Sequence, residues 1–254
     1  MLRGKFGNRK LHCIFLGKEI GFSFFTIIKD HFEVSSTIIV SDFLTQNEMD
    51  KLLDEGWSLL EYNGLIGCKQ NLELGFLLWW PNIIQSELIK KFQVGIVNLH
   101  PSLLPYGRGK DPYFWSIINE EPFGVSCHFI TDQIDSGQLI FQQEIETDWT
   151  DTSSTLRNKA LNCLYAQIER WVELIKEKRY DLVQIPNTKV HFRKDMLNAS
   201  KIDLTEMRTI KDLLNLLRAK SVDGHNGVEF EHAGRRFQVK VDIKEIYDES
   251  DREV

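Results

Sequence analysis

Short apolar runs alternate with segments of helical spacing between residues 11 and 99, and this alternation constrains the fold more than any other feature of the sequence. The runs LHCIFLG, STIIV, LGFLLWW and VGIVNL have the apolar composition of buried strands. Between them lie GFSFFTIIKDHF, QNEMDKLLDEG and SELIKKF, whose apolar residues recur as they do on one face of a helix. We therefore predict an α/β fold built on a doubly wound, mostly parallel sheet with helices on both faces.

The segment after this alternation continues the sheet and closes with one long helix. DPYFWSIINEE is predicted to be a helix, whereas FGVSCHFI and GQLIFQQEIE alternate as strands do. Apolar residues then fall three or four apart from Ser154 to about Lys178, and Thr152 and Ser153 stand where such a helix needs a cap. We expect this helix to close a first domain over residues 1–180.

The pattern changes from residue 181 onward. RYDLVQIPNTKVHFRKD is polar and irregular, and TIKDLLNLLRAK is typical of a short amphipathic helix. GVEFEHAGRRFQVKVDIKEI is typical of a hairpin that turns at Ala233 and Gly234. We predict a small α+β appendage over residues 181–254, made of a helix and a β-hairpin.

Charge and hydropathy disfavour several classes of protein. The chain of 254 residues has a net charge of -6 at pH 7, which gives no reason to expect a surface for nucleic acid. No apolar stretch reaches the roughly eighteen residues of a membrane span, and the start of the chain is not a signal peptide. The four cysteines are widely spaced, which disfavours a zinc site or a disulfide framework. We expect a cytoplasmic protein that needs no metal and has no membrane partner.

The stretch VNLHPSLLPYGRGKDPYFW places polar side chains at the end of a predicted strand, where open parallel sheets bind their ligands. Asn98 and His100 are two residues apart and so face the same side, and Pro101 ends the pairing there. Asp135 lies in a predicted turn, IDSG, that could aim its carboxylate inward. An amide, an imidazole and a carboxylate suit acyl transfer to a nucleophile on the substrate. Taken singly, each is more often a turn residue, a cap or a strand-end hydrogen-bonding residue than a catalytic one.

The same residues resemble the N10-formyltetrahydrofolate-dependent formyltransferases, and within them the nucleotide-sugar N-formyltransferases. The likeness lies in NLHPSLLPYGRGKDPYFW and in IDSGQLI, whose Asp135 follows the histidine by 35 residues. It is strong over residues 75–180 and weaker before and after. The resemblance implies a Rossmann-like fold with a catalytic domain over residues 1–180. The first strand is followed by GKEIGFS and not GxGxxG, so a dinucleotide site is not expected.

The resemblance also implies roles for the three polar residues. His100 would take a proton from the attacking sugar amine or its adduct. Asn98 would donate a hydrogen bond to the formyl oxygen, and Asp135 would orient His100 and stabilise its charge. Trp115 is expected to pack and hold the loop, and His128 is expected to be structural.

Further residues are expected to bind the two substrates. By resemblance, N10-formyltetrahydrofolate would lie along the loop after LGFLLWW and against the backbone near residue 130, with contacts from Trp79, Trp80, Pro81, Ile130, Thr131 and Asp132. Each tryptophan alone is as typical of a core residue. Arg108, Lys110 and Phe230 are candidates for contacts with the nucleotide-linked sugar, although loop cations are often simply solvated and the stretch GHNGVEFE is also typical of a plain turn.

We predict a homodimeric sugar N-formyltransferase that acts on a dTDP-linked 4-amino-4,6-dideoxyhexose, for a surface polysaccharide such as O-antigen in lipopolysaccharide. Methionyl-tRNA formyltransferase, glycinamide-ribonucleotide formyltransferase and formyltetrahydrofolate hydrolase are alternatives within the enzyme class. An inactive folate-binding module is the alternative outside it. The position of the amine and the choice of dTDP, UDP or GDP are left open by the sequence.

Overall fold

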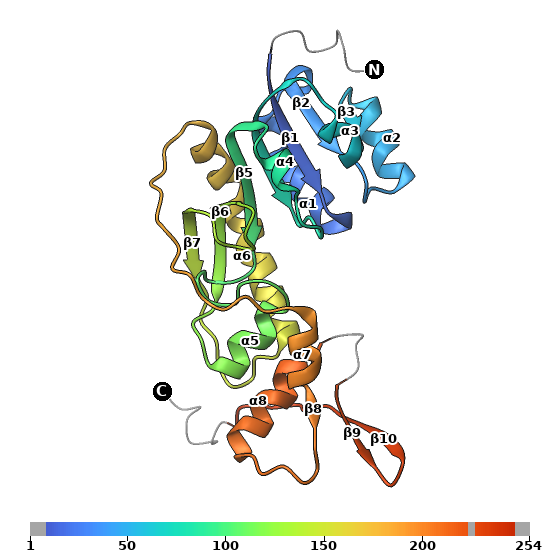
Figure 1. The fold of residues 1–254 in the computed structure, drawn as a ribbon, viewed down its shortest axis with the longest axis vertical. Coiled ribbons are helices and arrows are strands. Elements are labelled where there is room, and N and C mark those ends of the chain that lie inside the picture. The colour runs from blue at the N-terminus through green and yellow to red at the C-terminus, as the bar shows by residue number, and fades with distance from the viewer. Residues whose placement is uncertain (1–8, 223–226, 247–254) are drawn as a thin grey trace, which may run out of the picture. The chain divides into compact units, whose positions relative to one another are not determined.

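A computed structural model describes residues 9–222 and 227–246 and divides the chain into two compact units (Figure 1). The first unit comprises the chain up to His100 together with Val125–Gln143 and Asn162–Asn187. The second comprises Pro101–Gly124, Glu144–Leu161 and the chain from Thr188 onward. This division by contacts differs from the division of the sequence at residue 180, which stays a prediction about domains.

The first unit is built on the predicted sheet. Its seven strands lie in the order β3-β2-β1-β4-β5-β6-β7. Their bounds are Lys10–Leu16 for β1, Thr37–Val40 for β2, Ser58–Leu60 for β3, Asn71–Leu78 for β4, Phe92–His100 for β5, Gly124–Phe129 for β6 and Leu139–Glu144 for β7. The pairs from β3 to β5 are parallel, and β6 runs antiparallel to β5. The predicted α/β class with a mostly parallel sheet is therefore confirmed.

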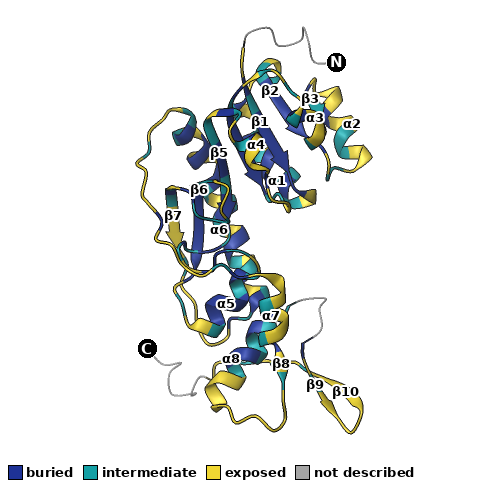
Figure 2. Cartoon of the chain, in the orientation of Figure 1, coloured by how far each residue is buried: buried dark blue, intermediate teal, exposed yellow. Residues whose placement is uncertain are grey.

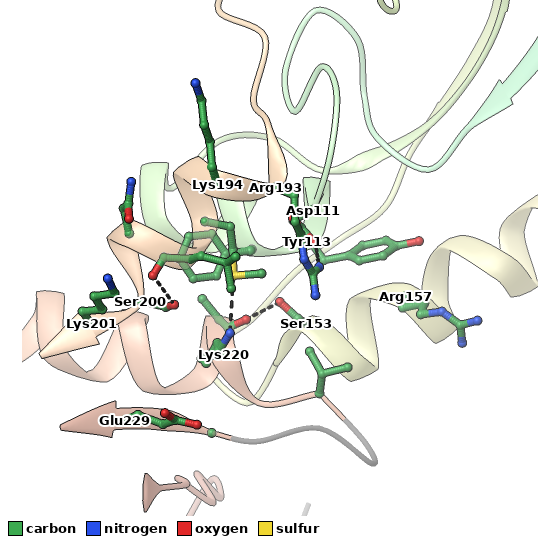
Figure 3. Close-up of a pocket in the computed structure, with 17 residues that line it drawn as sticks. Asp111, Tyr113, Ser153, Arg157, Arg193, Lys194, Ser200, Lys201, Lys220 and Glu229 are labelled. Atoms are coloured by element: carbon green, nitrogen blue, oxygen red, sulfur yellow. Dashed lines mark hydrogen bonds and ion pairs between the residues drawn. The ribbon is translucent and has the colours of Figure 1, made fainter. Parts of the chain in front are cut away.

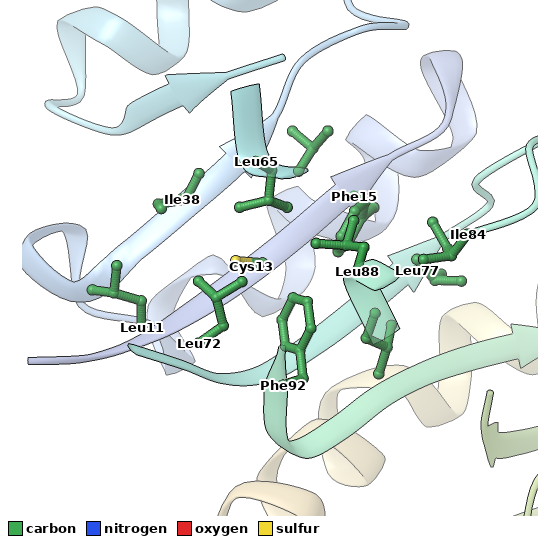
Figure 4. Packing of buried hydrophobic residues seen from close by; sticks show 12 residues of the cluster. Leu11, Cys13, Phe15, Ile38, Leu65, Leu72, Leu77, Ile84, Leu88 and Phe92 are labelled. Atoms are coloured by element: carbon green, nitrogen blue, oxygen red, sulfur yellow. The ribbon is translucent and has the colours of Figure 1, made fainter. Parts of the chain in front are cut away.

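Helices connect these strands. They are α1 over Lys18–Ile28, α2 over Gln46–Asp54, α3 over Tyr62–Ile66 and α4 over Ser86–Ile89, with two 3₁₀ turns over Lys29–His31 and Val34–Ser36. Helices α1, α2 and α4 fall in the predicted helical segments, whereas β3 and α3 had no counterpart in the prediction. A core cluster of fully or nearly buried side chains joins strands and helices, among them Leu11, Phe15, Ile38, Leu72 and Leu88 (Figure 4). β2 is buried at all four positions, and this accounts for the nearly continuous apolar sequence of the strand (Figure 2).

Two further helices agree closely with the ranges predicted from the sequence. α5 covers Pro112–Asn119, and α6 covers Ser153–Lys176 against a predicted 154–178. Thr152 caps α6, since its Oγ1 accepts a hydrogen bond from the backbone N–H of Thr155 at 3.3 Å. The expectation that Ser153 also acts as a cap is wrong. Ser153 is buried inside the helix, and its hydroxyl donates to the Ala219 carbonyl at 2.5 Å.

The second unit holds a small three-stranded sheet and two helices beside α5. These are α7 over Arg193–Ala199, β8 over Lys201–Ile202, α8 over Ile210–Lys220, β9 over Val228–His232 and β10 over Arg235–Val239. Strands β9 and β10 form the predicted hairpin, whose turn residues Ala233 and Gly234 have φ of 50° and 69°. Positive φ at both turn positions is the signature of a type I′ hairpin turn. Strand β8 pairs in parallel with β9 and had no counterpart in the sequence prediction.

Helix length and hydropathy show that no helix within residues 9–222 and 227–246 is both long and apolar enough to cross a membrane.

Candidate active site

The last residues of β5 carry two of the three predicted catalytic side chains. β5 lies between β4, which it joins in parallel, and β6, which runs against it. The register pairs Asn98 with His128 and His100 with Ser126 across β5 and β6. Directly opposed residues of an antiparallel pair share one face of the sheet. This register therefore places Asn98 and His128 side by side.

Asp135 comes from the loop between β6 and β7. Its φ of 44° is left-handed, and the next turn residue but one, Gly137, has no room for a side chain. A Cβ at Gly137 would lie 1.7 Å from the carbonyl oxygen of Phe129. The sequence IDSG therefore forms the tight turn predicted for it, because only glycine permits this close approach.

The turn brings the carboxylate of Asp135 to two imidazoles. Asp135 Oδ2 lies 3.7 Å from His100 Nδ1, and Asp135 Oδ1 lies 3.8 Å from His128 Nε2. The side chains of His100 and Asp135 are only 8% and 14% exposed. Water therefore screens the interaction between these two side chains weakly. The structure places the predicted pair His100 and Asp135 at ion-pair distance.

His128 contacts the predicted catalytic residues directly, which the sequence did not indicate. Its Nδ1 lies 2.8 Å from the carbonyl oxygen of Phe129, which can only accept, so the proton of the neutral ring sits on Nδ1. The Nε2 atom then accepts a hydrogen bond from the Asn98 amide nitrogen at 3.3 Å. His128 is fully buried and fixes which way the Asn98 amide is turned. The sequence analysis missed this contact because it depends on the register of β5 against β6, which places His128 opposite Asn98.

The thiol beside His128 does not offer a nucleophile. Cys127 precedes His128 in β6 and is fully buried, and burial raises the pKa of its thiol far above the ordinary value. A thiolate is therefore absent from this strand at neutral pH. An amide, an imidazole and a carboxylate can move protons and stabilise charge for a nucleophile that the substrate brings.

The six residues predicted to contact folate all belong to the first unit. The ring of Trp80 packs against Phe15, Phe43 and Tyr62, with centroid distances of 5.5, 4.8 and 6.0 Å. Its indole N–H is buried without a hydrogen-bond partner among the described residues. Trp79 is partly exposed and has a left-handed φ of 59°. Pro81, Thr131 and Asp132 are exposed, and Ile130 is half-buried.

The three residues predicted to contact the nucleotide-linked sugar belong to the second unit. Arg108 is not an exposed loop cation: it is only 2% exposed, and its Nη1 donates to the Thr188 carbonyl at 3.0 Å. This loop is covered by a distant segment, since the Lys110 N–H donates to the His191 carbonyl at 2.8 Å. Lys110 itself is exposed.

Two aromatic residues of the second unit were also singled out. Phe230 stacks on Phe237 across the hairpin, with 5.3 Å between ring centroids. The preceding part of GHNGVEFE, residues 224–226, lies outside the described residues. Trp115 is buried and stacks on His191 at a centroid distance of 3.9 Å, so its predicted packing is confirmed, and its part in holding the loop stays a prediction.

Metal-ligating side chains do not gather in the described part of the chain. Within residues 9–222 and 227–246, no three or more His, Cys, Asp or Glu side chains are grouped so as to hold a metal ion.

Comparison with protein families gives two matches that together cover most of the described chain. Residues 68–168, which include Asn98, His100 and Asp135, match the formyl transferase family. Residues 195–245 match the N-formyltransferase dimerization C-terminal domain. Residues 68–168 are therefore similar to formyl transferases. The predicted resemblance is thereby confirmed, and the second match extends it to the C-terminal segment of the chain.

Relatives of known name are similar to parts of this chain. The dTDP-4-amino-4,6-dideoxyglucose formyltransferase of Mycobacterium tuberculosis is 32% identical over 58% of this chain and 64% of its own length. The methionyl-tRNA formyltransferase of Clostridioides difficile is 28% identical over 54% of this chain and 44% of its own length. The matched region of this chain thus spans less than two thirds of either relative.

Solved structures match the fold over most of the chain. A 4-N formyltransferase from Francisella tularensis has a TM-score of 0.76 at 23% identity and covers 94% of this chain and 100% of its own. An N-formyltransferase from Helicobacter canadensis, solved with folinic acid and dTDP-3-aminofucose, has a TM-score of 0.63 at 19% identity. That match covers 83% of this chain and 80% of its own. The two likenesses confirm the formyltransferase fold.

Proposed function

We propose that this protein is a sugar N-formyltransferase, which moves a formyl group from N10-formyltetrahydrofolate to the amine of a nucleotide-linked amino sugar. The observation that carries the proposal is the convergence of Asn98, His100 and Asp135 within a stretch that matches the formyl transferase family. The second match, to a dimerization domain of N-formyltransferases, supports the amine as acceptor.

Each residue of the site has a part that follows from its surroundings. Bound N10-formyltetrahydrofolate would supply the formyl group as an electrophile. His100 takes the proton that the amine must lose, and Asp135, 3.7 Å away, stabilises the resulting imidazolium. Asn98 can donate an amide hydrogen to the formyl oxygen as negative charge grows there, because His128 holds the orientation of that amide.

The residues of the first unit fit a folate in part. The partner-free indole N–H of Trp80 and the exposed Pro81, Thr131 and Asp132 leave polar and apolar groups available to a ligand. Trp79 and Ile130 would complete the contacts. Trp80 is only partly exposed and packs in an aromatic cluster, so a pterin would meet the part of its ring that the cluster does not cover.

The sugar we propose is a dTDP-linked 4-amino-4,6-dideoxyhexose, whose product would enter a surface polysaccharide such as O-antigen in lipopolysaccharide. The name of the mycobacterial relative and the 4-N formyltransferase structure support this choice. Arg108, Lys110 and Phe230 remain the proposed contacts for it, although Arg108, being buried, would act through the loop that it holds. We place the reaction in the cytoplasm.

The proposed protein is a homodimer. Four of the five residues of β10 are exposed, and a second copy could cover them. The match of residues 195–245 to a dimerization domain supports this arrangement. Analytical ultracentrifugation should give a mass of two chains, and a single-chain mass across micromolar concentrations would contradict the dimer.

Methionyl-tRNA is the second candidate acceptor, because methionyl-tRNA formyltransferases also match this chain. Binding to tRNA requires neutralisation of many phosphates and weakens steeply with salt. Residues 181–254 contain thirteen Lys and Arg against fourteen Asp and Glu, so this segment carries no excess of positive charge. The charge balance favours the sugar.

Formylation assays with both acceptors test the proposal. The purified protein is incubated with N10-formyltetrahydrofolate and a panel of dTDP-, UDP- and GDP-linked amino sugars, and the gain in mass of the sugar is followed. We expect rapid formylation of a dTDP-4-amino sugar and little of charged initiator tRNA. Strongly salt-sensitive use of the tRNA with indifference to every sugar would overturn the proposal. No single-turnover transfer to any amine would instead indicate a folate-binding module.

A further inference from the structure

Residues 188–193, which we call the strap, lie along the loop between β5 and α5, residues 101–111. Both segments belong to the second unit. Thr188 and Arg108 are hydrogen-bonded although 80 positions separate them in the sequence, so the contact is a feature of the tertiary fold and not of a local turn. The loop carries Arg108 and Lys110, two of the proposed contacts for the sugar. The proposed reaction assigns no role to the strap.

The backbones of the strap and the loop are joined like two strands. The His191 N–H donates to the Arg108 carbonyl at 2.9 Å, and the Lys110 N–H donates to the His191 carbonyl at 2.8 Å. Gly109, between these two loop residues, forms a parallel bridge with His191. A Cβ at Gly109 would lie 2.2 Å from the His191 carbonyl oxygen. Glycine at this position therefore permits the close approach of the strap.

Side chains add to this attachment from both segments. The Thr188 hydroxyl donates to the Pro105 carbonyl at 2.7 Å, and Arg108 Nη1 donates to the Thr188 carbonyl at 3.0 Å. Arg193 forms an ion pair with Asp111, the last residue of the loop (Figure 3). The Arg193 side chain is 61% exposed, so water screens this pair. The buried Arg108 therefore contributes more to the attachment than Arg193 does.

His191 packs the strap against α5. Its ring stacks on Trp115 with 17° between the ring planes, and the two residues are both buried. Its Nδ1 is buried and makes no hydrogen bond to any described residue. Burial and the charge of Lys189 lower the pKa of His191, while Asp195 opposes this shift. At neutral pH the ring is therefore uncharged and serves as a flat packing surface.

We propose that the strap is a positioning element for the sugar, because it holds residues 101–111 in one conformation before the sugar binds. Gly107 and Gly109 both have positive φ, of 62° and 93°, and glycines lose much backbone entropy when they are ordered. A loop that is ordered on folding does not have to be ordered on binding, which favours affinity. Thr188 and His191 are positioning residues, since they act through the loop. This inference rests on the proposed function, which names the sugar as the ligand.

Steady-state formylation by strap variants tests the proposal. Thr188→Val keeps nearly the same shape and removes the bond to Pro105, so KM for the sugar should rise by about two- to tenfold. His191→Ala removes the stacked ring and should raise that KM by about tenfold or more, whereas His191→Phe keeps a flat ring beside Trp115 and should restore most of the affinity. We expect kcat and KM for N10-formyltetrahydrofolate to stay within about threefold of the parent, because the catalytic trio and the proposed folate contacts lie outside the loop.

The matched control is Thr205→Val. The Thr205 hydroxyl donates to Asp203 Oδ1 at 2.6 Å, so this change removes a threonine hydrogen bond of the same unit that lies outside the strap and the loop. Its KM for the sugar should equal that of the parent, and thermal melts confirm that each variant is folded. An unchanged KM in both Thr188→Val and His191→Ala, or an equal rise in Thr205→Val, overturns the proposal. Equal losses for both substrates in a folded variant would show general damage and also overturn it.

Hydrogen exchange gives a readout that does not depend on the reaction. The amides of Lys110 and His191 are bonded between the loop and the strap, so in His191→Ala they should exchange faster, the Lys110 amide by about tenfold. An equal rate for the Lys110 amide in the parent and in His191→Ala would overturn the proposed attachment. A parent protein that formylates no sugar would refute the proposed function, and the exchange rates would still decide whether the strap holds the loop.

Discussion

Replacement of Asp135 by asparagine removes one negative charge from the active site while the size of the side chain stays the same. In the parent protein this charge lies 3.7 Å from His100 Nδ1, and both side chains are at least 86% buried, given exposures of 8% and 14%. At an effective dielectric constant of about 20, two unit charges at this separation attract by about 4 kcal/mol. If that attraction stabilises the imidazolium only as the amine loses its proton, Asp135→Asn should lower kcat by about a thousandfold.

The assay is steady-state formylation of the preferred amino sugar, with both substrates varied so that kcat and KM are separated. We expect a loss in kcat and little change in KM for the sugar, because the charge acts on His100. His100→Asn should lose activity to a similar degree. The kcat of the double variant should lie within a few fold of the kcat of the less active single variant. The losses caused by residues that act as a unit do not add up.

A matched control exists in the same unit. Glu169 lies at the same distance of 3.7 Å from His31, but its side chain is 65% exposed. Water screens that pair, so Glu169→Gln should leave kcat unchanged. The reasoning is wrong if Asp135→Asn retains kcat within threefold of the parent while active-site titration shows intact protein. It is also wrong if Glu169→Gln is equally impaired.

Three further outcomes follow from the structure. Arg108→Met should lower the free energy of unfolding by about 1–3 kcal/mol in urea titrations, because it removes the hydrogen bond that the buried Arg108 side chain donates to the Thr188 carbonyl; a change below about 0.5 kcal/mol would contradict this. His128→Phe should reduce kcat by roughly ten- to a hundredfold with KM for the sugar little changed, since the Asn98 amide loses the acceptor that orients it, and full activity would exclude that positioning role. Treatment with EDTA should leave formylation intact, because no suitable group of ligands occurs within residues 9–222 and 227–246, and recovery of lost activity by one added divalent ion would refute this.

Local sequence signals predicted the features that depend on neighbouring residues. The hairpin turn at Ala233 and Gly234 and the cap at Thr152 were predicted because turn and cap chemistry acts over two or three residues. The common face of Asn98 and His100 was predicted because strand periodicity alone fixes it. The fold class was predicted from the alternation of strands and helices, because the order of these elements can be followed directly along the sequence.

Features that depend on distant segments were missed. The burial of Arg108 comes from residues about eighty positions away, and nothing in the loop sequence shows that segment. The two-residue strand β8 is too short to have a pattern of its own and exists only because β9 pairs with it. His128 looked like an ordinary strand residue because its contact with Asn98 requires the register of β5 against β6.

The interleaving of the two compact units has a consequence for how the chain is made. Each unit draws on three separate stretches, and the chain passes between them at 100/101, 124/125, 143/144, 161/162 and 187/188. A ribosome delivers residues in order, so the first unit lacks its last stretch until Asn187 has emerged, and the second waits for the residues after Thr188. A nascent chain halted near residue 180 would therefore hold both units incomplete. A protease cut at that place would likewise release no self-sufficient fragment, and mature protein should resist separation into two independently melting parts.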